Sequence, residues 1–209
     1  ASYGVGHLKP AVAYVILTVV LLLIFLIVGY PAFIAVFAHL NPFKFAKKIT
    51  RVAVFGFSTS SSAATLPLNV KTTVEELGVD EKIASFVLPL GMTINMNGTA
   101  IMQVIATLFI AGCAGYSISF TQLVVIALLA LIASAGTPAA PGSGAIILFT
   151  ILSGLGYVND AAMLAYSLIL AINRPIEMLV TALNVVGDSA TSIYVANSEG
   201  ALNEDVYNA

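Results

Sequence analysis

Residues 134–144 read Ser-Ala-Gly-Thr-Pro-Ala-Ala-Pro-Gly-Ser-Gly, and this stretch decides the fold. It separates two apolar segments, 121–134 and 145–155. Each segment is too short to cross the roughly 30 Å hydrocarbon core of a bilayer as a helix. Non-helical backbone at membrane depth is tolerated only where protein or a water-filled cavity satisfies its polar groups. The stretch therefore predicts the tip of a re-entrant helical hairpin over residues 121–156.

A second stretch of small residues, Phe57 to Pro67, reads FSTSSSAATLP and has charged segments on both sides. A run of hydroxyl residues that closes with a proline is a poor interior for a lipid-facing helix. We therefore expect a non-helical middle and a first re-entrant hairpin over residues 44–78. Two opposed hairpins together with broken helices are typical of secondary transporters.

The composition excludes several classes of protein. Of 209 residues, 59% are hydrophobic and 9% are charged, which is roughly a third of the charge of a soluble domain. Eight basic and ten acidic residues give a net charge of −2 with no basic block, so no nucleic-acid partner is expected. One cysteine cannot form an internal disulfide, and two histidines cannot build a zinc site. The expected partner is the lipid bilayer.

Long runs without charge predict the membrane spans. They indicate a transmembrane helix over 8–40 with a kink at Pro31, a broken transmembrane helix over 83–114, a transmembrane helix over 161–196 and a polar tail over 197–209. The break in the second span is expected between Gly91 and Thr99. Six of the eight basic residues, from Lys44 to Lys82, then lie on one side, which is the cytoplasmic side by the positive-inside rule. Tyr14, Tyr30 and Tyr116 fall near span ends and are expected at the membrane interface.

Four polar residues of the last span share one narrow helix face, within about 60° at 100° per residue. They are Glu177, Thr181, Asn184 and Asp188. Two acids aligned at membrane depth suggest a compensating cation, because an unpaired charge there costs ~2.5–3.5 kcal/mol. The alternative is that Arg174 and Glu177 form an ion pair with a purely structural role, which leaves Asp188 without a partner.

Four motifs resemble the dicarboxylate/amino acid:cation symporters, also called the glutamate transporter family. They are SSSAATLP at 60–67, NMNGT at 95–99, GTPAAPGSG at 136–144 and NVVGD at 184–188. The resemblance covers the C-terminal half of the family, so residues 1–209 are expected to be part of a transport domain without its N-terminal scaffold half. It implies an all-α polytopic protein of the plasma membrane, with two opposed re-entrant helical hairpins and broken transmembrane helices, that co-transports Na⁺, is not an enzyme and forms a homotrimer through the scaffold.

The resemblance also implies site residues. The substrate shell corresponds to Ser62, Thr99, Ala140, Gly144, Glu177, Val180, Thr181 and Asn184. The first sodium site corresponds to Gly91, Asn95, Asn184 and Asp188, the second to Thr93, Met96, Ser134, Ala135 and Thr137, and one ligand of the third to Asn97. The hairpin tips would receive the substrate carboxylate on backbone N–H groups, Asn184 would bind the main-chain part of an amino acid, and Glu177 would bind its ammonium group.

Three departures from the family pattern bear on the substrate. Val180 stands where members for acidic substrates have an arginine, and neither Ser60 nor Met178 supplies the arginine seen nearby in other relatives. A buried carboxylate without a bidentate partner is costly to bind, so a neutral amino acid is favoured. Glu177 replaces an aspartate, and Asn97 replaces the aspartate of the third sodium site, which loses its charge.

The sequence therefore predicts sodium-coupled symport of a neutral amino acid, with the second hairpin as outer gate and the domain moving as a rigid elevator. Proton-coupled symport of an amino acid or dicarboxylate through Glu177, or a channel-like anion pathway, stays open as an alternative. The serines of the two tips could suggest an intramembrane hydrolase, but neither histidine is placed in the membrane core to activate one of them.

Overall fold

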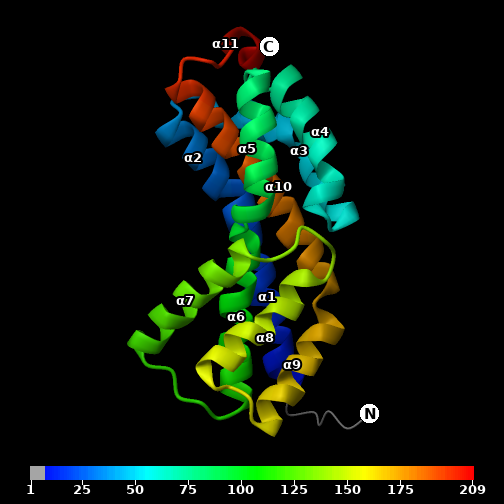
Figure 1. The fold of residues 1–209 in the computed structure, drawn as a ribbon, viewed down its shortest axis with the longest axis vertical. Coiled ribbons are helices and arrows are strands. Elements are labelled where there is room, and N and C mark those ends of the chain that lie inside the picture. The colour runs from blue at the N-terminus through cyan, green and yellow to red at the C-terminus, as the bar shows by residue number, and fades with distance from the viewer. Residues whose placement is uncertain (1–7) are drawn as a thin grey trace.

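The computed structural model describes residues 8–209, which are almost entirely helical (Figure 1). In this part of the chain the only β-bridge joins Val79 to Leu202. Three helical stretches are long and apolar enough to cross a membrane: Lys9–Phe37, Glu81–Cys113 and Arg174–Ser198. Many large apolar side chains of the first stretch are exposed, as a lipid-facing surface requires. The all-α membrane fold expected from the sequence is confirmed.

The first span consists of three consecutive elements, α1 (Leu8–Ile24), the π-helix η2 (Phe25–Gly29) and α2 (Tyr30–Phe37). The irregularity expected at Pro31 is present, because proline cannot donate to the carbonyl four residues earlier and the wider π turn precedes it. The span ends at Phe37 rather than at residue 40, since Asn41 caps the next helix by accepting from the N–H of Phe43 at 2.9 Å.

The first hairpin contains α3 (Pro42–Thr59) and α4 (Ser62–Glu75). The non-helical middle expected within residues 57–67 is present but short, because only Ser60 and Ser61 lie outside the helices. The hydroxyl residues remain helical by bonding to their own helix: Ser58 donates to the carbonyl of Val54 at 2.8 Å. Ser61 caps α4, and Pro67 is accommodated inside it.

The second broken span consists of α5 (Glu81–Ile94) and α6 (Asn97–Cys113). The break expected between Gly91 and Thr99 is confined to two residues, Asn95 and Met96. The second hairpin consists of α7 (Phe120–Ala135) and α8 (Ser143–Leu155), close to the segments expected from the sequence. Gly142 has a φ of 82°, a left-handed conformation that suits glycine and turns the chain into α8.

The last span is not one helix. It is divided at Asn173 into α9 (Asp160–Ile172) and α10 (Arg174–Ser198). Pro175 explains the division, because it cannot donate the backbone hydrogen bond to the preceding turn. Asn173 is buried at this break and accepts a hydrogen bond from the hydroxyl of Tyr14 at 2.6 Å.

Helix α10 is the centre of the fold. Most of its side chains are buried, and it contacts α1 to α6 as well as α9. Figure 1 shows the α3–α4 hairpin and the α7–α8 hairpin approaching α10 from opposite ends of the molecule. The tips of these hairpins meet, because the hydroxyl of Ser61 donates to the carbonyl of Ala139 at 3.0 Å.

The segment expected to be a polar tail is folded onto the other helices. It includes α11 (Glu204–Asn208), and the ring of Tyr207 is fully buried. Lys48 Nζ donates to the carbonyls of Glu76, Val206 and Tyr207 at 2.7–2.9 Å. These bonds fasten the end of the described chain to α3 and to the end of α4.

Candidate functional site

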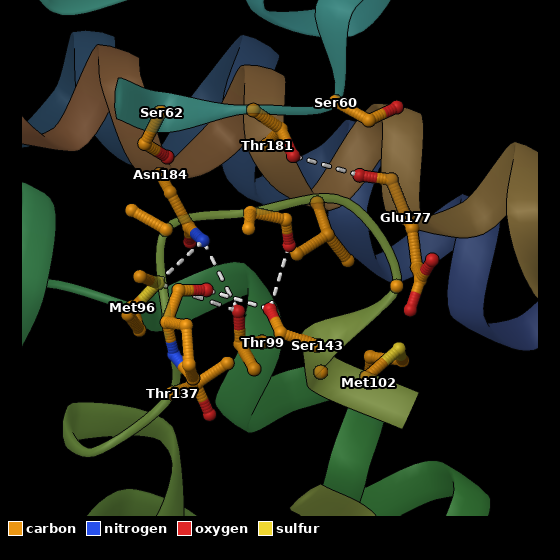
Figure 2. A pocket seen from close by; sticks show the side chains of 16 residues that line it. Ser60, Ser62, Met96, Thr99, Met102, Thr137, Ser143, Glu177, Thr181 and Asn184 are labelled. Atoms are coloured by element: carbon orange, nitrogen blue, oxygen red, sulfur yellow. Dashed lines mark hydrogen bonds between the residues drawn. The ribbon is translucent and has the colours of Figure 1, made fainter. Parts of the chain in front are cut away.

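A small cavity of about 30 Å³ lies where the two hairpin tips meet α6 and α10 (Figure 2). All eight residues expected in the substrate shell line it: Ser62, Thr99, Ala140, Gly144, Glu177, Val180, Thr181 and Asn184. Met96 and Thr137, expected at the second sodium site, line it as well. Residues far apart in the sequence are thus brought to one place, and their role in binding remains a prediction.

Helix α10 contributes the polar face that the sequence indicated. Glu177, Thr181, Asn184 and Asp188 are each less than one-tenth exposed. The hydroxyl of Thr181 donates to the backbone carbonyl of Glu177 at 3.0 Å, one turn earlier in the same helix. The polar stripe therefore faces the protein interior.

Asn184 fastens the α5–α6 break to α10. Its Oδ1 accepts from the N–H of Gly98 at 2.8 Å, and its Nδ2 donates to Thr99 Oγ1 at 3.1 Å. The backbone at the break has helix ends whose polar groups need partners. Asn184 supplies such a partner at the start of α6, so its amide side chain joins α6 to α10.

Glu177 does not pair with Arg174. Arg174 is exposed, and the one ion pair within residues 8–209 joins Lys71 to Glu75 at 3.9 Å. Glu177 Oε1 instead accepts from the backbone N–H of Ala145 in α8 at 3.2 Å. The alternative of an Arg174–Glu177 ion pair with a purely structural role is therefore wrong for this structure.

The tip of the second hairpin is held by its own hydrogen bonds. Ser143 Oγ donates to the carbonyls of Pro138 and Ala140 at 2.6 and 2.7 Å. The N–H of Ala63 in the first hairpin donates to the carbonyl of Ala139 at 3.4 Å. Both tips thus form one wall of the cavity.

A second polar cluster lies farther along α10, around Asp188. Asn95 Nδ2 donates to Asp188 Oδ1 at 2.9 Å, and Asn97 Nδ2 donates to Asn95 Oδ1 at 2.8 Å and to the Tyr30 hydroxyl at 3.1 Å. Gly91 lies so close that a Cβ there would be 2.6 Å from Asp188 Oδ1. The cluster joins Gly91, Asn95 and Asp188 of the expected first sodium site to Asn97. Carboxylate, amide and hydroxyl oxygens suit a hard cation.

Comparison with known proteins identifies the family of this chain. The model of the sodium:dicarboxylate symporter family matches residues 1–198. The chain belongs to this family. A putative sodium-dependent excitatory amino acid transporter of Caenorhabditis elegans, glt-4, is 36% identical over 90% of this chain and 37% of its own length. Excitatory amino acid transporter 1 of Rattus norvegicus is 35% identical over 84% of this chain and 32% of its own length. The chain thus spans about a third of the curated relatives it matches.

Membership of a symporter family assigns the chain to transport proteins rather than enzymes. The relatives and the three membrane-length helices agree with the multi-pass plasma-membrane location expected from the sequence. None of the residues that line the cavity is a lysine or an arginine.

The residues expected at the second sodium site are less closely gathered in this chain. Ser134 and Thr137 are buried, and their hydroxyls donate to carbonyls of α7, those of Leu131 and Ala133, at 2.9 Å. Thr93 is exposed on α5 and Ala135 is exposed on α7, two helices that contact each other. This site remains a prediction.

Sequence reasoning missed the inward position of two tyrosines. Tyr14 and Tyr30 are 2% and 6% exposed, so their expected place at the membrane interface is wrong. The Tyr14 hydroxyl donates to the buried amide of Asn173, and the Tyr30 hydroxyl accepts from the half-buried amide of Asn97. One signal was available for Tyr30: it follows Gly29 and precedes Pro31, and helix irregularities are frequent at functional sites.

Proposed function

We propose that this chain is the substrate- and sodium-binding part of a sodium-coupled symporter for a neutral amino acid. The observation that carries the proposal is Val180, which lines the cavity where acidic-substrate members of the family have an arginine. The side chain is 5% exposed and apolar, so it can contact only an uncharged part of the substrate. A side-chain carboxylate placed there would be desolvated without a partner.

The amino and carboxyl groups of the substrate each have a partner of opposite charge in the cavity. Backbone N–H groups at the start of α8 are suited to a carboxylate, since a helix N-terminus favours anions. Glu177 is suited to an ammonium group, and Asn184 can bond to either main-chain group after a change in its present contacts. The cavity thus recognises the part that all amino acids share, and Val180 faces the variable part.

The cation would be held around Asp188 in this proposal. Asp188 is 2% exposed and its carboxylate accepts from Asn95, with no cationic side chain paired to it within residues 8–209. A bound sodium ion would neutralise this charge and draw α5, α6 and α10 together. Closing of the α7–α8 hairpin over the substrate, followed by an elevator movement within a homotrimer, completes the proposed cycle.

One observation favours proton coupling as the second candidate. Glu177 is 8% exposed and has no cationic partner in the part of the chain that the structure describes. Acidic side chains at membrane depth form the proton relays of pumps and transporters. In that case the driving ion would be H⁺, and the substrate would bind equally well in sodium and in choline.

Thermal-shift titration tests the substrate class. Because a ligand that binds only the folded state stabilises it by about 2.7 kcal/mol at 100 times its Kd, binding raises the melting midpoint. We expect neutral amino acids to raise the midpoint in sodium, and glutamate, aspartate and succinate to leave it unchanged at the same concentrations. An equal shift with aspartate would contradict the assignment to neutral substrates.

A further inference from the structure

A carboxylate from α10 caps helix α8. Ala145 is the third residue of α8, so its N–H has no acceptor within the helix. Gly142, the residue before the helix, has no side chain that could supply one. Glu177 Oε1, 32 positions away in the sequence, accepts from this N–H at 3.2 Å. Helix caps usually come from residues close in sequence, whereas the cap of α8 comes from Glu177 in the cavity wall formed by α10.

The surroundings of Glu177 show why it takes this position. It is 8% exposed, and Arg174 in the preceding turn is exposed and does not pair with it. A helix N-terminus stabilises a negative charge, so the start of α8 is its available electrostatic partner. Gly144 lies beside the carboxylate: a Cβ there would be 4.0 Å from Glu177 Oε1, which is ordinary van der Waals contact.

The same cavity contains a polar group that is left without a partner. Ser60 lines the cavity, is 3% exposed, and its Oγ has no hydrogen-bond partner among residues 8–209. Buried hydroxyls are rarely left unbonded in folded proteins. Figure 2 shows Ser60 in the cavity wall together with Glu177. An unpaired hydroxyl and a capped helix end in one wall point to a ligand with polar groups.

We propose that Glu177 is a built-in competitor for the carboxylate of the ligand. In the ligand-free protein it occupies the N-terminus of α8, and an incoming carboxylate has to displace it. The identity of the ligand rests on the proposed function, whereas the position of Glu177 does not. The glutamate length matters, because an aspartate would end one methylene short of the Ala145 N–H.

This competition makes Glu177 a determinant of ligand specificity. Once displaced, its carboxylate is buried beside the carboxylate of the ligand, and two like charges at one helix end repel each other. An amino acid offsets this with its ammonium group, which pairs with Glu177. A dicarboxylate such as succinate has no cationic group to do so. The site therefore admits zwitterions and rejects simple carboxylates.

Amide-resolved hydrogen exchange of the ligand-free chain tests the position of Glu177. In Glu177→Asp we expect the Ala145 amide to exchange about tenfold faster, because a hydrogen bond to a charged group is lost. Glu177→Gln keeps the length and an acceptor oxygen, so its increase is smaller. Thr107→Val, a nearly isosteric change of a buried threonine of α6 whose hydroxyl donates to the carbonyl of Gln103 at 2.8 Å, is the matched control and leaves the rate unchanged.

The amides of Val185 and Val186 in the buried centre of α10 report on folding and are expected to exchange at the same rate in all variants. If Glu177→Asp does not fold, the comparison of Glu177→Gln with the unmodified chain decides the question. An Ala145 exchange rate that is the same in the folded Glu177 variants and in the unmodified chain would overturn the inference, whatever the chain binds.

Binding of two probes tests the specificity. L-alanine and succinate are titrated in sodium against the unmodified chain and Glu177→Gln. We expect the ratio of alanine affinity to succinate affinity to fall at least tenfold in Glu177→Gln. The uncharged glutamine no longer repels the carboxylates of succinate and no longer pairs with the ammonium group of alanine. An unchanged ratio would overturn the specificity role. Failure of every amino acid to bind, together with faster exchange in Glu177→Asp, would contradict the proposed function but support the displaced-cap position of Glu177.

Discussion

The substitution Val180→Arg is expected to shift preference from neutral towards acidic amino acids by about 100-fold. Val180 lines the cavity and is 5% exposed, so a guanidinium group there would face the substrate side chain. Two charge-assisted hydrogen bonds to a carboxylate, each worth about 1.5 kcal/mol or more, amount to this factor. The measurement is competition between alanine and aspartate at equilibrium.

Two controls separate the charge of the new side chain from its size. Val180→Met adds length without charge and is expected to weaken both substrates alike. Val180→Lys adds a point charge that cannot form a bidentate pair, so its shift is smaller than that of arginine. A folded Val180→Arg protein with an unchanged order of preference would show that Val180 does not face the variable part of the substrate.

The substitution Asp188→Asn is expected to remove the effect of sodium and to reverse the order of stability. Asp188 is 2% exposed and has no paired cation in residues 8–209. Without sodium, the neutral variant should melt at or above the unmodified chain, because an unpaired buried charge is destabilising. With sodium, the unmodified chain should melt higher, since only its carboxylate gains the ion as a partner.

The matched control for this reversal of stability is Asp160→Asn, which removes a carboxylate from the exposed start of α9. It is expected to keep the full sodium-dependent rise of the melting midpoint. Melting curves in sodium and in choline at equal ionic strength provide the measurement. A sodium-dependent rise of the same size in Asp188→Asn would remove Asp188 from the cation site.

The hairpins could be predicted where the sequence contains residues that cannot continue a helix. Gly136, Pro138, Pro141 and Gly142 leave the chain few alternatives to a turn, and the helices on either side begin and end close to the expected residues. The length of the break in the first hairpin could not be predicted from its hydroxyl run. Ser and Thr side chains can hydrogen-bond either to groups outside their helix or to carbonyls of their own helix. Here they bond within it, and the break shrinks to Ser60 and Ser61.

The polar face of α10 could also be predicted, because helical periodicity places Glu177, Thr181, Asn184 and Asp188 on one side. What they contact could not be predicted in this way. The bond between Glu177 and Ala145 depends on how the α7–α8 hairpin packs against α10. The burial of Tyr30 depends on a facing glycine, Gly187, where a Cβ would collide with the tyrosine hydroxyl. Such contacts are set by packing between distant segments.

We propose that sodium and a neutral amino acid bind cooperatively to this chain, so that each raises the affinity for the other. The direct test of this proposal is the affinity for L-alanine in sodium and in choline at equal ionic strength, measured together with the affinity for sodium with and without L-alanine. Coupling is reciprocal, so both ratios must be equal, and we expect about tenfold or more. Equal alanine affinities in sodium and choline would contradict the claim.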